Sequence, residues 1–247
     1  MSNSALAIFL DSPMQSWGAG SRFQRRETET FPTKSGVLGL IAAAMGIDKH
    51  AEDEADQLKP LAALSFSVFR IRNADGNVQV QRLVDFHTVG GGWYDDWQAD
   101  KSDIRAKMQT PCKAGDGSPF GTVITRRSFL TDARFIAVLE GEDSAIQTIA
   151  SALQNPTWGV WFGRKCCLPA SPLTPTLGAN AEAAVVALLG RLELDSGVST
   201  IGDGVHEPNH QDAETWYQSD YPISFGKREF QSRPVTRHSP FTYGGNL

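Results

Sequence analysis

The chain has 247 residues, of which 40% are hydrophobic and 21% are charged, and its formal net charge is −5. This length supports one large domain or two small ones with a substantial core. The acidic balance disfavours a free-standing nucleic-acid binder, whose surface is usually basic. The longest apolar run, residues 37–47, is shorter than the ~20 residues that a membrane span needs. The first ten residues lack a signal-peptide pattern, so we expect a cytoplasmic protein that contacts no membrane.

The first two thirds of the chain predict strands and helices in the order β-α-β, insertion, β-α-β. Thr33 or Ser35 can cap the first helix, and Gly46 suits its end. The expected elements are a buried strand at 5–10, a helix from 33 or 35 to 45, an acidic helix at 52–59, a strand at 65–72, a strand at 135–139, a helix at 144–153 and a strand at 158–162.

Residues 73–125 contain turn dipeptides and a triple glycine but little apolar periodicity. A stretch of this length with so little core signal is unlike the interior of a compact layer. We expect a projecting insertion with strand-like flanks at 78–88 and 122–130. The fold class is then α+β, a ferredoxin-like (RRM-like) βαββαβ domain that carries a long insertion.

The character of the chain changes after residue 163. Three prolines in residues 168–175 indicate a linker or surface loop. We expect a helix at 181–192, a loop at 195–215, a strand at 221–225 and a basic tail from 226 to 247. The expected division is residues 1–172, a ferredoxin-like domain with its insertion at about 73–130, and residues 173–247, a smaller C-terminal extension.

The chain is organised around residues 12–46, in which a polar, aromatic and basic loop precedes a buried helix. Guanidiniums pair with phosphate oxygens in forked geometry, and a helix start offers backbone N–H groups to an anion. An indole can stack on a base, although a core indole is equally compatible with the pattern. The alternative is an ordinary surface loop on a core helix, its charges partly cancelled by Glu27 and Glu29. The candidate RNA-binding residues in this segment are Gln15, Ser16, Trp17, Arg22, Arg25, Arg26, Thr33, Lys34 and Ser35.

Further candidates lie at the two ends of the insertion and beyond it. His87 lies on one flank, at the base of the insertion, where an RNA contact and a structural bond to Asp85 are both open readings. Arg126 and Arg127 lie on the other flank, and strand geometry lets only one of the two face a groove directly. Arg164 and Lys165 complete the set of cationic candidates.

The sequence gives little support for a bound metal or cofactor. Residues 206–210 match H-E-x-x-H by letters, but Pro208 breaks the helix that a zinc version requires. Three cysteines, two of them adjacent, suit neither a disulfide framework nor a metal knuckle. We therefore expect no cofactor and no metal.

A ribonuclease needs a general base near the 2′-hydroxyl and a cation for the phosphate. Lys49 and His50 form the one adjacent pair of that type, and the acidic stretch 48–56 beside them would repel RNA. A solvated helix end is the better reading of this pair, so no catalytic residue is assigned.

Several segments resemble a known family in order and spacing. These are PMQSWG, SRF and PTKSGVLGLIAAAMGI between residues 13 and 47, DFHTVG at 85–90, TRRSFLTDARF at 125–135 and FGRKCCLPASP at 162–172. Together they are similar to the CasD family of type I-E CRISPR Cascade complexes, within the RAMP superfamily. The likeness runs from about residue 6 to residue 172 and more loosely to the arginine-rich tail.

This resemblance implies a non-catalytic subunit of an antiviral ribonucleoprotein that binds and caps the 5′ handle of crRNA. It implies that the insertion is a β-hairpin thumb, with His87 and Arg126 or Arg127 at its base bending the RNA. The implied partners are crRNA, the backbone and large subunits of Cascade, and target DNA indirectly. The rival reading is a metal-independent endoribonuclease that processes repeat RNA, as relatives in type I-C systems do.

Overall fold

The structure, a computed structural model, describes residues 2–18, 20, 24–72, 80–89, 123–193, 201–208 and 215–238, and the account below concerns these residues. Its main feature is an antiparallel seven-stranded sheet in the order β10-β11-β9-β4-β7-β1-β8. The strands are β1 (Asn3–Asp11), β4 (Ser65–Ile71), β7 (Arg134–Glu142), β8 (Thr176–Gly178), β9 (Ile201–His206), β10 (Trp216–Ser224) and β11 (Glu229–His238). The expected α+β class is confirmed.

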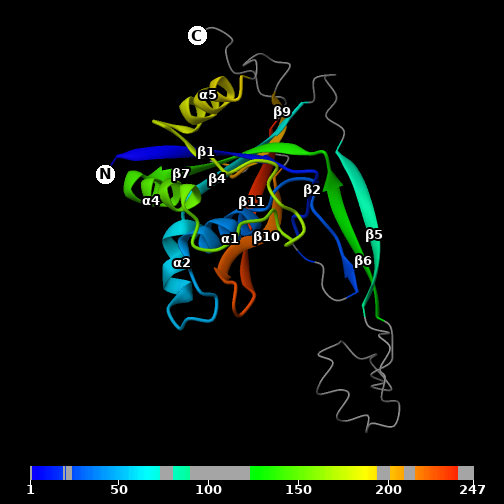
Figure 1. Ribbon diagram of the computed structural model, residues 1–247. Helices are drawn as coiled ribbons and strands as arrows, with labels where there is room; N and C mark the ends of the chain where they lie inside the picture. Colours follow the sequence, from blue (N-terminus) through cyan, green and yellow to red (C-terminus); the bar gives the residue numbers. More distant parts are fainter. Residues whose placement is uncertain are drawn as a thin grey trace, which may run out of the picture.

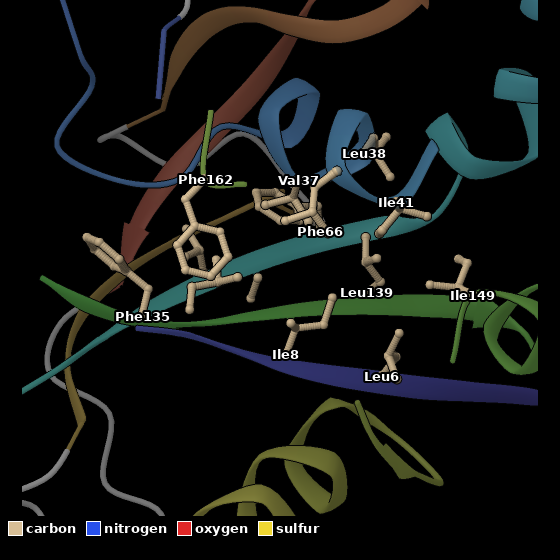
Figure 2. Packing of buried hydrophobic residues seen from close by; sticks show 14 of the residues in the cluster. Leu6, Ile8, Val37, Leu38, Ile41, Phe66, Phe135, Leu139, Ile149 and Phe162 are labelled. Atoms are coloured by element: carbon tan, nitrogen blue, oxygen red, sulfur yellow. The ribbon is translucent and has the colours of Figure 1, made fainter. Parts of the chain in front are cut away.

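Helices cover both faces of this sheet (Figure 1). The helices α1 (Lys34–Met45), α2 (Glu54–Ala62) and α4 (Asp143–Gln154) lie on one side, and α5 (Ala181–Arg191) lies on the other. Alternate residues of β1 enter two separate cores, because successive strand side chains point to opposite faces. Leu6 and Ile8 pack toward α1 and α4, as Figure 2 shows, whereas Ala5 and Ala7 pack beneath α5. No helix within the described ranges is long and apolar enough to cross a membrane.

Helix α1 begins and ends where its sequence predicts. The hydroxyl of Thr33 accepts a hydrogen bond from the N–H of Gly36, which makes Thr33 the N-cap. Gly46 ends the helix with φ 75°, a left-handed conformation that glycine adopts without strain. The apolar side of the helix, with Val37, Leu38 and Ile41, lies on the sheet (Figure 2).

A smaller sheet carries a projecting hairpin (Figure 1). Strand β5 (Gln81–Val89) pairs with β6 (Val123–Thr131) along its whole length, so both strand-like flanks of the expected insertion are confirmed. Strands β2 (Met14–Gln15) and β3 (Arg25–Arg26) attach the N-terminal loop to the other edge of β6. Residues 90–122 of the insertion lie outside the described residues.

The strand expected at 158–162 is wrong. This segment is a loop whose backbone bonds to helix α1 and to nearby turns instead of to a sheet. The N–H of Thr157 donates to the carbonyl of Ala44 at 2.8 Å, and that of Trp158 donates to Ala43 at 3.2 Å. These donors satisfy carbonyls in the last turn of α1, so the segment stabilises the C-terminal end of that helix.

The loop expected at 195–215 and the basic tail expected from 226 are also partly wrong, since β9 and β11 are strands. Strand β9 contains two glycines and an aspartate, so its pattern is weak, yet it lies between β4 and β11 and pairs with both. Two neighbours supply the backbone bonds that the local sequence does not predict. The division of the chain at residue 172 stays a prediction, and residues on both sides of it share one sheet.

Candidate nucleic-acid interface

Trp17 and Gln15 lie inside the protein. The Trp17 indole is 0% exposed, and its ring lies 5.9 Å from that of Phe162, centroid to centroid. Its Nε1 donates to Oε1 of Gln15 at 3.0 Å, while Nε2 of Gln15 donates to the carbonyls of Leu10 and Ala133. Since ring and amide are both buried and engaged, the expectation that these two side chains stack on or read a base directly is corrected.

Ser16 and Gly163 hold the loop ends around this indole. The N–H of Ser16 donates to the carbonyl of Phe162 at 3.1 Å, and its hydroxyl donates to the carbonyl of Ser128. Gly163 has φ 90°, and a Cβ there would lie 1.7 Å from the Ser16 carbonyl oxygen. The two loops therefore touch through backbone at a point that only glycine fits.

The ammonium of Lys34 points inward and is not a surface cation. Its side chain is 2% exposed, and Nζ donates to the carbonyl of Leu64 at 2.7 Å and to Glu207 at 2.8 Å. Burial lowers the pKa of Lys34, and the neighbouring Glu207 carboxylate opposes that shift. The expected contact between this ammonium and phosphate is corrected, because the charge is neutralised within the fold.

The start of α1 also carries its own anion. The N–H of Lys34 donates to Oδ2 of Asp220 at 2.7 Å, and Arg233 holds the same carboxylate through two nitrogens. The N–H of Gly36 goes to Thr33, which is fully buried. The helix dipole is therefore complemented by a protein carboxylate. Ser35 and Gly36 are partly exposed and line the clefts described below.

Four arginines meet where β3 pairs with β6. The pairing is parallel, with Arg25 opposite Arg126 and Arg26 opposite Arg127. Residues opposite each other share a face and successive residues alternate, so the two pairs lie on opposite faces. Arg25, Arg26 and Arg126 are exposed and Arg127 is half-buried. We call these four side chains with Arg164 the arginine cluster.

Arg164 ties the cluster to the loop after Phe162. Its guanidinium donates to the carbonyls of Ser128 at 3.1 Å and Arg26 at 3.0 Å, and it lies 4.5 Å from the centroid of the Phe129 ring. Burial lowers the pKa of Arg164, and the positive charges of Arg127 and Arg26 act in the same direction. The Arg164 guanidinium is thus held close to the positive charges of Arg26 and Arg127.

Acidic side chains offset only part of this charge. Glu27 bonds to Nε of Arg25 at 2.8 Å and accepts from the Ser128 hydroxyl at 2.9 Å. That hydroxyl, together with Arg25, lowers the pKa of Glu27. Asp85 lies opposite Arg127 in the hairpin register. The arginines of the cluster outnumber Glu27 and Asp85, and this excess of positive charge favours an anionic ligand.

The hairpin presents a different side chain set on each face. His87 is half-buried on the face that also carries Asp85 and Arg127, and its Nδ1 has no hydrogen-bond partner among the described residues. The other face carries Phe86, which is exposed and has the Arg126 guanidinium 5.9 Å from its ring centroid. The two adjacent arginines of β6 therefore serve different faces, as strand geometry requires.

Two clefts adjoin the arginine cluster. The arginine cleft has a volume of about 280 Å³ and is lined by the chain around Arg26, Arg164, Ser35 and Phe230. The tryptophan cleft has a volume of about 520 Å³ and lies between α1 and the loop 158–161, and Asp48 and Lys49 also line it. Ser35, Gly36, Gly163 and Phe225 line both clefts.

The sequence did not single out the tryptophan cleft, and Arg22 of the predicted set lies outside the described residues. Lys165 lies next to this cleft, with Nζ 5.5 Å from the ring centroid of Trp161. The signal that could have found it is the interleaving of aromatic and basic residues in TWGVWFGRK, residues 157–165.

Comparisons with known proteins agree with one another. Residues 5–236 match the family described as CRISPR-associated protein (Cas_Cas5). The chain is 33% identical over 179 residues to the CRISPR system Cascade subunit CasD of Escherichia coli (strain K12), which covers 69% of each chain. A chain of a solved CRISPR RNA-guided surveillance complex is 27% identical with a TM-score of 0.65, covering 96% of this chain and 90% of that one. A crystal structure of a Cas protein is 27% identical with a TM-score of 0.59, over 96% and 95% of the two chains.

Proposed function

Because the chain belongs to the CRISPR-associated Cas5 family, we propose that it is the subunit of a type I-E Cascade complex that holds the 5′ handle of crRNA. In this role it caps one end of the backbone, contacts the large subunit and meets target DNA only through the assembled complex. It works in the cytoplasm as part of an antiviral ribonucleoprotein. The named relatives, a Cascade subunit and a chain of an RNA-guided surveillance complex, support this proposal.

The parallel register of β3 and β6 is the observation that carries the proposal. It places Arg26 and Arg127 on one face, close to Arg164, and Arg25 and Arg126 on the other face, although the chain as a whole is acidic. Like charges repel, so neighbouring arginines are unfavourable on their own, and a bound anion offsets that repulsion. A phosphodiester backbone is a ligand whose repeated charges match the neighbouring guanidiniums of Arg26, Arg127 and Arg164.

Buried members of the predicted set act by shaping this surface. Trp17, bonded to Gln15, also bonds through its backbone to Thr28 and Glu29 after β3, and Lys34 fixes the start of α1. Thr33 caps the same helix. Exposed cations beside them, including Lys165, then contact the RNA.

The hairpin acts as a thumb that bends the RNA between handle and guide. Phe86 and Arg126 offer an aromatic ring and a cation on one face, and His87 with Arg127 offers polar groups on the other. Inserted between nucleotides, such a hairpin contacts both sides of the bend. The thumb corresponds to residues 73–130, and the described strands β5 and β6 form its base.

A ferredoxin-like core for residues 1–172 is part of the same proposal. The antiparallel order β4-β7-β1, with α1 and α4 on one face of the sheet, supports it. The short strand β8 pairs with the other edge of β1, although it lies beyond residue 172. In chain order the hairpin follows β4 and precedes β7, and it projects from the core on the side that carries the arginine cluster.

The direct test is the RNA content of the complex. The chain is co-expressed with the other Cascade subunits and crRNA, and the complex is purified through another subunit. Arg26→Ala with Arg127→Ala should lower the crRNA recovered per chain, since two guanidiniums are lost from one face. The matched control is Lys59→Ala with Lys227→Ala, which removes the same charge from exposed sites on α2 and the β10–β11 turn. Equal crRNA in both variants contradicts the proposal.

The subunit holds RNA without cutting it. Incubation of the pure chain with labelled repeat RNA in EDTA should leave the RNA intact. Cleavage that disappears in His50→Ala or His87→Ala would establish the endoribonuclease instead. His50 is exposed and its N–H donates to the Asp48 carboxylate, which is a poor setting for an anionic substrate.

A further inference from the structure

The tryptophan cleft has one wall of small residues and one wall that carries aromatic side chains. Its wall on α1 is made by Gly36, Gly39 and Ala43, whose side chains leave the helix surface open. The opposite wall is the loop that carries Trp158 and Trp161. Backbone hydrogen bonds from 157 and 158 to carbonyls at the end of α1 tie this loop to the helix. A slot of about 520 Å³ has the volume of a small-ligand site.

Its aromatic lining is reachable from solvent. Trp158 is 45% exposed, although an indole is a residue that proteins usually bury. The Lys165 ammonium lies 5.5 Å from the centroid of the Trp161 ring, so a cation borders the aromatic surface. Lys49 also lines the cleft beside Asp48, and this pair adds no net charge. Stacking rings bordered by cations are the pairing found in single-strand nucleic-acid sites.

The slot is continuous with the arginine cleft. Gly163 and Phe225 line both, and Arg164 lies directly after Gly163 in the chain. A strand whose phosphates lie on Arg26 and Arg164 can therefore turn one base into the neighbouring slot. An apolar anchor from a protein partner would gain nothing from these cations, which favours the nucleotide.

We propose that the tryptophan cleft binds a nucleobase flipped out of the handle, stacked on Trp158 or Trp161, while the arginine cluster holds the adjoining phosphates. This inference rests on the proposed function and adds a second subsite to it. The arginine cluster then recognises the phosphate charge, and the tryptophan cleft recognises the flat face of a base without regard to sequence.

The test compares RNA with and without bases. The full-length chain is titrated with a fluorescently labelled eight-nucleotide oligoadenylate and with an oligomer of the same length made of abasic nucleotides. The wild-type chain should bind the adenylate about tenfold or more tightly than the abasic oligomer, the size expected for one or two stacked bases. Trp158→Leu with Trp161→Leu should abolish this ratio while leaving the affinity for the abasic oligomer unchanged.

A second variant fills the slot without removing any side chain. A Cβ at Gly39 would lie 3.6 Å from the Phe225 ring, an ordinary contact, so Gly39→Leu is expected to fold and to place its side chain in the cleft. It should also reduce the ratio toward one. The control is Trp216→Leu, which removes a 39% exposed indole from the sheet edge at β10 and should preserve the ratio.

The outcomes separate the two proposals. Failure of both oligomers to bind, with no effect of Arg26→Ala and Arg127→Ala, would overturn RNA binding itself. Tight binding of both oligomers with a ratio near one in the wild-type chain would overturn the base subsite alone. Loss of another subunit from the purified complex in Gly39→Leu, with the adenylate ratio intact, would make the cleft a protein contact and also overturn the subsite.

Discussion

The carboxylate of Asp220 accepts a hydrogen bond at 2.7 Å from the backbone N–H of Lys34, 186 residues away in the chain. Strand β10 thus supplies the anion at the start of α1, a place where a helix favours negative charge. Arg233 holds the other oxygen of the same carboxylate at 2.6 Å, and Glu207 accepts from both cations. The cluster is neutral as a whole, so it fastens the C-terminal strands to the helix and leaves RNA binding to the surface arginines.

Lys34→Met should therefore damage stability before it affects RNA binding. The substitution leaves the Leu64 carbonyl without its donor and leaves Glu207 paired with Arg233 alone, and an unsatisfied buried polar group typically costs about 1–3 kcal/mol. Urea denaturation of the full chain, followed by circular dichroism, measures the loss. Lys59→Ala, an exposed lysine on α2, is the control and should change the free energy of unfolding by less than about 0.5 kcal/mol. An unaltered midpoint in Lys34→Met would show that the internal pairing is wrong.

The salt dependence of RNA binding should report the arginine cluster directly. Each phosphate contact with single-stranded RNA adds about 0.7 to the slope of log K against log salt concentration. Arg26→Ala with Arg127→Ala should therefore lower that slope by about 1.4. The measurement is fluorescence anisotropy of labelled handle RNA at several potassium chloride concentrations. A weaker affinity with an unchanged slope would mean that these arginines shape the site without touching phosphate.

Removal of a carboxylate should strengthen RNA binding. Glu27 bonds to Arg25 on the exposed side of β3 and remains ionised at neutral pH, since the Ser128 hydroxyl and Arg25 lower its pKa. Glu27→Gln frees the guanidinium and should tighten the dissociation constant about two- to fivefold, the range of a surface ion pair. Glu229→Gln, on the exposed end of β11, is the matched control. Weaker binding in Glu27→Gln would mean that Glu27 orients Arg25 for its contact.

The adjacent thiols Cys166 and Cys167 should react very differently with iodoacetamide. Burial, with the neighbouring Cys166, raises the pKa of Cys167 to about 12, whereas Cys166 is exposed. The thiolate is the reactive form, so mass spectrometry at pH 8 should find Cys166 alkylated and Cys167 intact.

The same shift makes stability depend on pH. The folded state favours the protonated thiol of Cys167, so this contribution is complete below the unfolded value of 9.0 and is lost as pH rises toward about 12. Cys167→Ala should lack that part of the alkaline decline in the free energy of unfolding. Equal declines in Cys167→Ala and the wild-type chain between pH 9 and 12 would contradict the burial of this thiol.

Gly163→Ala should be destabilising although it changes a single methyl group. Its φ of 90° is unfavourable for alanine, and the added Cβ would meet the carbonyl oxygen of Ser16. We expect a loss of more than about 1 kcal/mol in unfolding free energy together with weaker RNA binding, since this contact joins both clefts. Gly190→Ala on α5, where a Cβ would meet nothing, is the control and should be neutral or stabilising. Equal stability of the two variants would argue against the close loop contact.

The sequence predicts the elements whose signals are local. The Thr33 cap, the apolar spacing after it and Gly46 are enough to define α1, and alternation is enough for β4 and the flanks of the hairpin. Order and spacing of short segments also identify the family. These signals survive because each depends on neighbours within a few residues.

What each polar side chain does is decided by tertiary contacts. The same letters around residue 17 fit a base-stacking indole or a core indole, and Phe162, 145 residues later, makes it a core indole. Lys34 reads as a surface cation until Glu207 and Asp220 arrive from distant strands to enclose it. Four arginines come together only because a two-residue strand pairs with β6. Burial and pairing depend on which distant segments meet, and no local pattern carries that information.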